Sequence, residues 1–408
     1  MTVREAFFAR LLLTTVLTSG AAVAMEEEAD LTSDGNGTFA TEERSMRNAI
    51  SDIESSHGAY AAGLPEQMLS LGLSLQKQER HGEALAVFKR GVHLARINNG
   101  LYSAEQIPLL QGEIKSAIAL GDYGQVDELQ EYLYRVQQRG LPVGEARANT
   151  LIQQATWHFN AYQLGLGDSG PERLLTMWDL YRLAWNDLLS TEEENSPKLL
   201  PPLYGLLRTQ YLISKYQSAS DGSGNNFSSN YGSANANRFY TYRAQSYDLG
   251  RSVILSIHNI QSANHGNSSE EAAQALVSLG DWAMWYGKRG DATEIYQHAI
   301  AELAPRDDAQ PEELAILNEP VPLPDMRGLQ SLPTPVSAEE GNILVEFGVD
   351  GRGKVIDLTR LDTNEDMDAT ATRLMRVLRG TKFRPRFEAG EPVVTDKLVR
   401  AYDINPNE

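Results

Sequence analysis

The chain has 408 residues, of which 41% are hydrophobic and 22% are charged, as in soluble globular proteins with more than one domain. Its formal net charge of -19 argues against nucleic-acid binding, which requires a basic surface. The chain contains no cysteine, which excludes disulfides, thiol chemistry and cysteine-based metal sites.

Residues 1–24 have the layout of a secretory signal peptide. Two arginines precede an apolar stretch at 11–17, and Ala22-Val23-Ala24 supplies the small-x-small cleavage pattern. The pattern predicts cleavage after Ala24, with Ala22 and Ala24 as the recognised small residues. The alternative is an uncleaved N-terminus that anchors the protein in a membrane. Residues 25–44 are acidic and rich in Ser, Gly and Thr, which predicts a disordered segment.

Residues 45–305 show helical periodicity and an internal repeat. The segments 65–96 and 272–305 carry small and bulky residues at the same offsets, which match the tetratricopeptide repeat (TPR) pattern. In the first copy these are Met68, Leu71, Gly72, Leu75, Ala84, Phe88 and Gly91, and in the second Leu276, Leu279, Gly280, Ala283, Ala292, Tyr296 and Ala299. The small residues would let antiparallel helices approach closely, which predicts a solenoid of helical hairpins.

The stretch between these copies predicts further, degenerate helix pairs. A helix break is predicted at 120–123 (Leu-Gly-Asp-Tyr), and 145–164 would pair with 171–190, and 198–217 with 237–262. Residues 218–237 hold almost nothing to bury and predict a flexible loop. All five tryptophans lie in the helical region, where their spacing favours packing over ligand binding.

A proline-rich linker is predicted at 306–337, followed by a small α+β domain at 338–408. Alternating apolar residues predict strands on both sides of the turn Asp-Gly-Arg-Gly-Lys at 350–354, and helical spacing at 367–379 predicts one helix. A last strand follows within 391–404. The fold class is therefore mainly α, a TPR-like solenoid followed by a ββαβ domain.

Gly348-x-x-x-x-Gly353-Lys354 is one residue short of a phosphate-binding P-loop. A P-loop needs Ser or Thr after the lysine and then a helix, whereas Val355 follows here and continues as a strand. We therefore expect no nucleotide, and assign Gly351 and Gly353 to the positive-φ positions of a hairpin turn.

The terminal domain resembles the C-terminal domain of the TonB family of energy transducers, over the last sixth of the chain. The residues that carry the resemblance are Val349, Asp350, Gly353, Val355, Phe383, Arg384, Pro385, Gly390 and Pro392, followed by Val393. The resemblance implies a periplasmic domain that pairs an extended peptide of an outer-membrane transporter with an exposed sheet edge. By analogy the edge is Val393, Val394, Thr395, Asp396, Lys397, Leu398, Val399, Arg400, Ala401 and Tyr402.

The chain departs from that family in two respects. Family members keep an N-terminal membrane anchor and a long proline-rich spacer, whereas here a signal-like leader and a helical array stand in their place. The leading hypothesis is a periplasmic, non-enzymatic adaptor that binds envelope or outer-membrane transport proteins through its terminal edge and the concave surface of its repeats. The alternatives left open are an energy transducer anchored in the inner membrane and facing the periplasm, and an envelope hydrolase. The edge itself could be covered by the linker or by a second copy in a homodimer.

The terminal helix and the residues directly after it contain a basic cluster. Arg373, Arg376 and Arg379 share one helical face, and Lys382, Arg384 and Arg386 come next. The alternatives are contact with an acidic partner, docking on the acidic helical array, or a solvated face. The seven histidines lack the spacing of a metal site, so we expect no metal and no cofactor.

Overall fold

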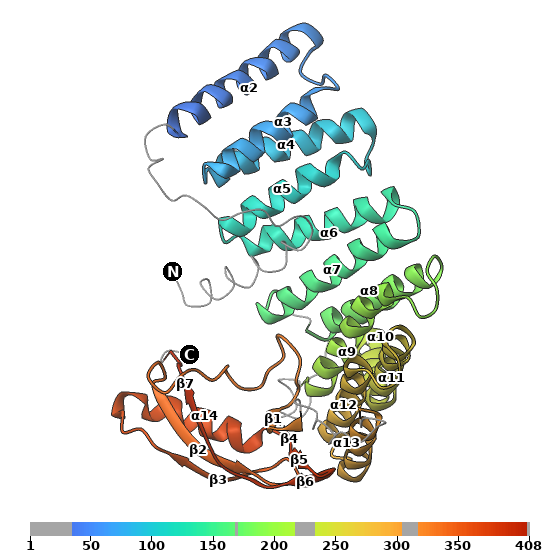
Figure 1. Cartoon of the computed structure of the whole chain (residues 1–408). Helices are drawn as coiled ribbons and strands as arrows, with labels where there is room; N and C mark the ends of the chain where they lie inside the picture. Colours follow the sequence, from blue (N-terminus) through green and yellow to red (C-terminus); the bar gives the residue numbers. More distant parts are fainter. Residues whose placement is uncertain (1–34, 168–169, 217–232, 304–316, 406–408) are drawn as a thin grey trace. The chain divides into compact units, whose positions relative to one another are not determined.

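The computed structural model describes residues 35–167, 170–216, 233–303 and 317–405 (Figure 1). The predicted signal peptide, with Ala22 and Ala24, lies outside these residues. Contacts along the chain divide it into two compact units, residues 1–150 and 151–408. No helix within the described residues is long and apolar enough to cross a membrane.

The first unit is a series of helices in which α2 to α6 each pack against the next. Its helices are α2 (Gly35–His57), α3 (Leu64–Lys77), α4 (His81–Asn99), α5 (Gln106–Ala119), α6 (Tyr123–Gly140) and the start of α7 (Glu145–Gln163). The predicted break at 120–123 is confirmed. Gly121 has a φ of 73°, and the Asp122 side chain accepts a hydrogen bond from the backbone N–H of Gln125 and caps α6.

The predicted disorder of residues 25–44 is wrong for 35–44, which form the first part of α2. Residues 25–34 lie outside the described part of the chain. Composition misled the prediction because polar residues 41–45 belong to a helix whose first buried apolar residue comes later, at Ile50, which is 7% exposed.

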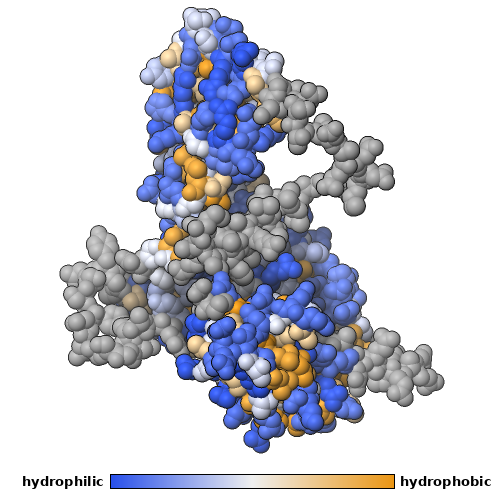
Figure 2. All heavy atoms as spheres, turned by 90° about the vertical axis from the view of Figure 1, so that its left-hand side faces the viewer, coloured by the Kyte–Doolittle hydropathy of each residue, from blue (hydrophilic) through white to orange (hydrophobic). Residues whose placement is uncertain are grey.

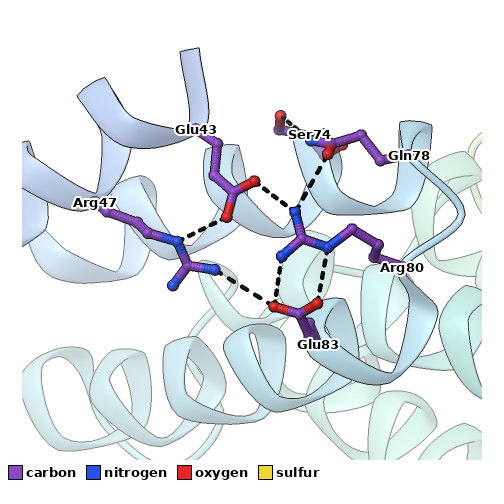
Figure 3. A network of polar contacts seen from close by, with 6 residues as sticks. All are labelled: Glu43, Arg47, Ser74, Gln78, Arg80 and Glu83. Carbon is purple, nitrogen blue, oxygen red and sulfur yellow. Dashed lines mark hydrogen bonds and ion pairs between the residues drawn. The ribbon is translucent and has the colours of Figure 1, made fainter. Parts of the chain in front are cut away.

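A network of charged side chains joins α2 to the first repeat (Figure 3). Glu43 accepts hydrogen bonds from Arg47 Nε at 2.8 Å and from Arg80 Nη1 at 2.5 Å. Arg80 also binds Glu83 through Nε and Nη2, at 2.8 and 2.7 Å. The hydrogen bonds from Arg47 and Arg80 lower the pKa of Glu43. Because Arg80 precedes α4, the network fixes α2 to the connection between α3 and α4.

Both predicted repeat copies show the same contact between a small and a large residue. The ring of Phe88 lies so close to Gly72 and Gly112 that a Cβ atom at either glycine would approach it to 2.4 and 2.6 Å. In the second copy the ring of Tyr296 lies over Gly280, where a Cβ would meet Cε1 at 2.4 Å. Phe88 and Tyr296 are both fully buried. The in-phase match therefore reflects one packing arrangement that is used twice.

The second unit begins with further helices. One of them, α10, begins inside the loop that was predicted at 218–237, so the end of that prediction is wrong. The helices are the rest of α7, α8 (Gly170–Leu189), η1 (Pro197–Leu199), α9 (Leu200–Lys215), α10 (Ser233–Ala244), α11 (Ser246–His265), α12 (Glu270–Trp285) and α13 (Arg289–Leu303). Residues 233–237 are thus helical, and the rest of the predicted loop lies outside the described residues. Trp157, Trp178 and Trp282 are buried, as expected of packing residues.

The terminal region contains the predicted ββαβ order with short strands added. Its elements are β1 (Val321–Pro322), β2 (Ile343–Val349), β3 (Val355–Arg360), η3 (Glu365–Met367), α14 (Asp368–Gly380), β4 (Phe383–Arg384), β5 (Arg386–Glu388), β6 (Glu391–Val393) and β7 (Thr395–Tyr402). The main sheet has the antiparallel order β3-β2-β7. Alternate residues of β2 pack against the apolar face of α14, in a core that includes Ile343, Val345, Phe347, Leu374 and Leu378.

The predicted linker at 306–337 is corrected for its described part, 317–337, which packs against the rest of this unit. Leu317 and Leu323 are buried at 1% and 0% exposure in a core that α12 and α13 share with Phe387. Strand β1 pairs with β4, and the Leu323 N–H donates to the Lys382 carbonyl at 2.8 Å. The segment packs because apolar residues lie between its prolines and become buried. Its composition had predicted a spacer.

The contact between glycine and aromatic ring generates a prediction about stability. Replacing Gly72 with Ala should lower the free energy of unfolding by about 1–3 kcal/mol, because the added methyl group overlaps the Phe88 ring. Urea unfolding monitored by circular dichroism measures the change.

The matched control is Gly82 on α4, where an added Cβ meets no atom within 4 Å. Gly82→Ala should be neutral or stabilising by up to about 1 kcal/mol, because glycine weakens helices. Equal effects of the two substitutions would contradict the packing described for Phe88.

Candidate functional site

The β2–β3 turn brings two of the sequence motifs into contact. The Asp350 side chain accepts hydrogen bonds from the N–H groups of Arg352 and Lys354, at 2.9 and 2.8 Å. Gly353 has a φ of 72°, and its carbonyl accepts from the Phe383 N–H at 2.9 Å. A Cβ at Gly353 would lie 2.0 Å from the Phe383 carbonyl oxygen. Glycine is therefore required both by the turn and by the approach of β4.

The expectation that Gly351 also has a positive φ is wrong, since only Gly353 does so in this turn. Gly351 instead lies close to another backbone segment, because a Cβ there would be 3.0 Å from the Pro392 carbonyl oxygen. The turn thus contacts the second motif pair, Gly390-x-Pro392, as well as β4.

The β5–β6 hairpin is formed by that second motif pair and packs on α13. Ala389 and Gly390 both have positive φ, as a two-residue hairpin turn requires. The Phe387 ring lies against Tyr296, with 5.2 Å between ring centroids. Gln297 Nε2 donates to the Gly390 carbonyl at 3.1 Å. The hairpin therefore attaches the terminal domain to the last helix pair (Figure 1).

Arg384 is the centre of this attachment. Its side chain is 1% exposed, and Nη1 donates to Asp281 on α12 at 2.9 Å, while Nη2 donates to Asp325 at 2.8 Å. The other carboxylate oxygen of Asp281 accepts from the Tyr296 hydroxyl at 2.8 Å. One guanidinium therefore joins the second repeat copy, the segment after β1 and strand β4 of the terminal domain.

Burial sets the electrostatics of this cluster. It raises the pKa of Asp281 to about 6, and the attraction of Arg384 and the hydrogen bond from Tyr296 act in the opposite direction. Burial acts to lower the pKa of Arg384, but Asp281, Tyr296 and Asp325 outweigh it and the pKa is raised. At neutral pH the pair is therefore ionised. Leaving either charge buried without its partner would cost several kcal/mol.

The predicted basic cluster is divided by the structure. Arg384 binds Asp281 of the helical array. Lys382 donates to the Trp285 carbonyl, and its Nζ lies 5.5 Å from the centroid of the Trp285 ring. The basic face made of Arg373, Arg376 and Arg379 is exposed on α14 instead. Arg384 and Lys382 therefore contact the helical array. Contact of the exposed α14 face with an acidic partner stays a prediction.

The predicted binding edge is not one strand. Val393 ends β6 and pairs with Arg386, Val394 lies between strands, and β7 begins at Thr395. Strand β7 is the last strand in the order β3-β2-β7. It pairs with β2 on one side, and its other side is an edge of the sheet. Near its end this edge is covered, since the Val336 N–H donates to the Ala401 carbonyl at 2.9 Å.

The stretch from Thr395 to Val399 is the uncovered part of this edge within the described residues. The Ala401 carbonyl points away from β2, and alternation along the strand places the backbone groups of Val399 on the same outer side. The Val399 side chain is 45% exposed and that of Val394 is 50% exposed. Figure 2 shows apolar areas on the lower part of the molecule, where the terminal domain faces the viewer.

Sequence reasoning missed the two acidic partners of Arg384. Asp281 directly follows Gly280 of the second repeat copy, and an acidic residue next to a repeat glycine was the signal available in the sequence. Asp325 lies in the segment that was interpreted as a spacer. The described residues contain no group of three or more His, Asp or Glu side chains that could hold a metal ion.

No family model and no curated protein matches the chain. Two similar solved structures are crystal structures of nearly identical TPR-like repeats from a protein described as a kinesin light chain of Podosopora anserina, one of them a variant. The variant is 12% identical and covers 60% of this chain and 97% of its own, with a TM-score of 0.38. The other is 12% identical and covers 59% and 94%, also at 0.38. Such scores are too low to carry an argument, so the repeat assignment depends on the helix pairs of this chain.

The Arg384 cluster generates a prediction for unfolding. Arg384→Met should lower the free energy of unfolding by about 3–5 kcal/mol, because Asp281 stays buried without its counter-ion. Urea unfolding monitored by tryptophan fluorescence measures the change. Arg379→Met, on the exposed face of α14, is the control and should change it by less than about 0.5 kcal/mol.

The pairing itself is tested by adding Asp281→Asn to Arg384→Met. The double variant should lose less than the sum of the two single losses, because the second substitution removes the unpaired charge. Strictly additive losses would show that the two side chains are not coupled.

Proposed function

We propose that the chain is an exported, non-enzymatic adaptor that binds proteins of the cell envelope. Helical hairpins packed through matched small and large residues support the general part of this proposal, since such arrays present long side-chain surfaces for protein partners. The leader at 1–24 supports export, and the resemblance of the terminal domain to the TonB family supports a periplasmic location.

The terminal sheet would capture an extended segment of its partner by strand addition. The observation that carries this step is the outer edge of β7 from Thr395 to Val399, which no described strand covers. A peptide that pairs there gains backbone hydrogen bonds, and the exposed side chains of Val394 and Val399 offer apolar contacts. The resemblance names the partner class, the outer-membrane TonB-dependent transporters.

The attachment of the terminal domain favours an adaptor over an anchored energy transducer. A transducer needs its terminal domain to reach across the envelope on a spacer. Here Arg384 and the β5–β6 hairpin hold that domain on α12 and α13, and residues 317–337 pack beside it. The adaptor would therefore hold its sheet edge in a fixed position on α12 and α13.

Site-specific photocrosslinking tests the proposed edge in the full-length chain. A photoreactive benzoylphenylalanine in place of Val399 should crosslink to an outer-membrane protein from envelope extract. The matched control is Val377 on α14, which has the same 45% exposure and lies away from the edge. Crosslinks of equal yield at both positions, or none at Val399, would contradict strand addition.

Blocking the edge should remove the crosslink. With the photoreactive residue moved to Val394, Val399→Pro should reduce capture about tenfold, because proline removes an outward N–H without breaking the pairing to β2. A crosslinked pair of this chain instead of a captured envelope protein would assign the edge to a homodimer.

A further inference from the structure

The first unit contains a cavity of about 530 Å³ between α4 and α6, with α5 as its floor. This volume is within the range of sites that bind small molecules. Its lining is largely apolar and includes Ala86 and Val92 of α4, Leu110 of α5, and Leu129 and the Tyr132 ring of α6. The Tyr132 hydroxyl donates a hydrogen bond to the side-chain oxygen of Gln106 at 2.6 Å, so Tyr132 contributes its ring to the lining.

The α4 wall of the cavity carries positive charge in a chain that is strongly acidic. Lys89, His93 and Arg96 follow one another at helical spacing on the same face of α4. Within the described residues no carboxylate lies within ion-pair distance of Lys89 or Arg96. The other lining cation, Arg90, is paired with Glu54. Two cations are therefore available to a ligand.

Glu113 lies on the floor of the cavity and is only 3% exposed. It has no hydrogen-bond or ion-pair partner in the described part of the chain. Burial raises the pKa of its carboxyl group to about 7, and Lys89 partly offsets the rise. The protonated carboxyl can donate a hydrogen bond, and a buried polar group of this kind is normally satisfied.

We propose that this cavity binds a small amphiphilic anion. The apolar body of the ligand would lie between α4 and α6, its anionic group would bind Lys89 and Arg96, and an acceptor atom would face Glu113. This site lies in the first unit and is independent of the strand edge, so either proposal can fail without the other.

Two fluorescent probes with the same aromatic body test the site in the full-length chain. The probe 8-anilinonaphthalene-1-sulfonate carries an anionic group, and N-phenyl-1-naphthylamine lacks it. The double substitution Lys89→Met and Arg96→Met should weaken saturable binding of the sulfonate about tenfold or more, because charge-assisted contacts are lost. Binding of the neutral probe should stay within about twofold. Lys115→Met, at an exposed residue of α5 outside the lining, should leave both probes unchanged.

Filling the cavity provides the second measurement. Ala86 is exposed at the cavity wall, so Ala86→Trp fills the space without altering the buried core. This variant should lose one equivalent of both probes while its circular dichroism stays that of the wild type. The proposal is overturned if the wild type shows no saturable binding of the sulfonate, or if either variant binds it as the wild type does.

Discussion

The buried ion pair between Arg384 and Asp281 is the interaction on which the second unit depends. The Tyr296 ring packs on Gly280, and its hydroxyl group binds Asp281, the residue that follows. The packing of Tyr296 on the repeat glycine thus orients the Asp281 carboxylate. Arg384 of the terminal domain binds this carboxylate at 2.9 Å. Because all these groups are buried, the pairing tolerates little change in position.

This arrangement changes what the terminal domain can do. Its motif residues Gly353 and Phe383 join the β2–β3 turn to strand β4, and Gly390 accepts a hydrogen bond from Gln297 of α13. The segment at 317–337 is part of the same contact and also covers the end of β7 at Ala401. The stretch of this edge from Thr395 to Val399 is uncovered within the described residues. This stretch is the surface that the proposed strand addition would use.

Sequence patterns predicted the features that depend on local periodicity. The repeat offsets located Gly72, Phe88, Gly280 and Tyr296, and alternation located the strands that flank the β2–β3 turn. Features that depend on long-range contacts were missed. Composition suggested a spacer where Leu323 is buried, and disorder where Glu43 joins a charge network (Figure 3). The partners of Arg384 were missed for the same reason, because 103 residues separate it from Asp281 and periodicity carries no information about such pairs.

Hydrogen–deuterium exchange of the full-length chain tests most directly whether Arg384 holds the terminal domain on the last helix pair. In the wild type, α13 and the β5–β6 hairpin should show similar protection, because they would open together. In Arg384→Met both segments should exchange faster, while the β2–β3 hairpin, packed under α14, keeps its protection. Unchanged exchange in α13 and the β5–β6 hairpin of that variant would contradict the account.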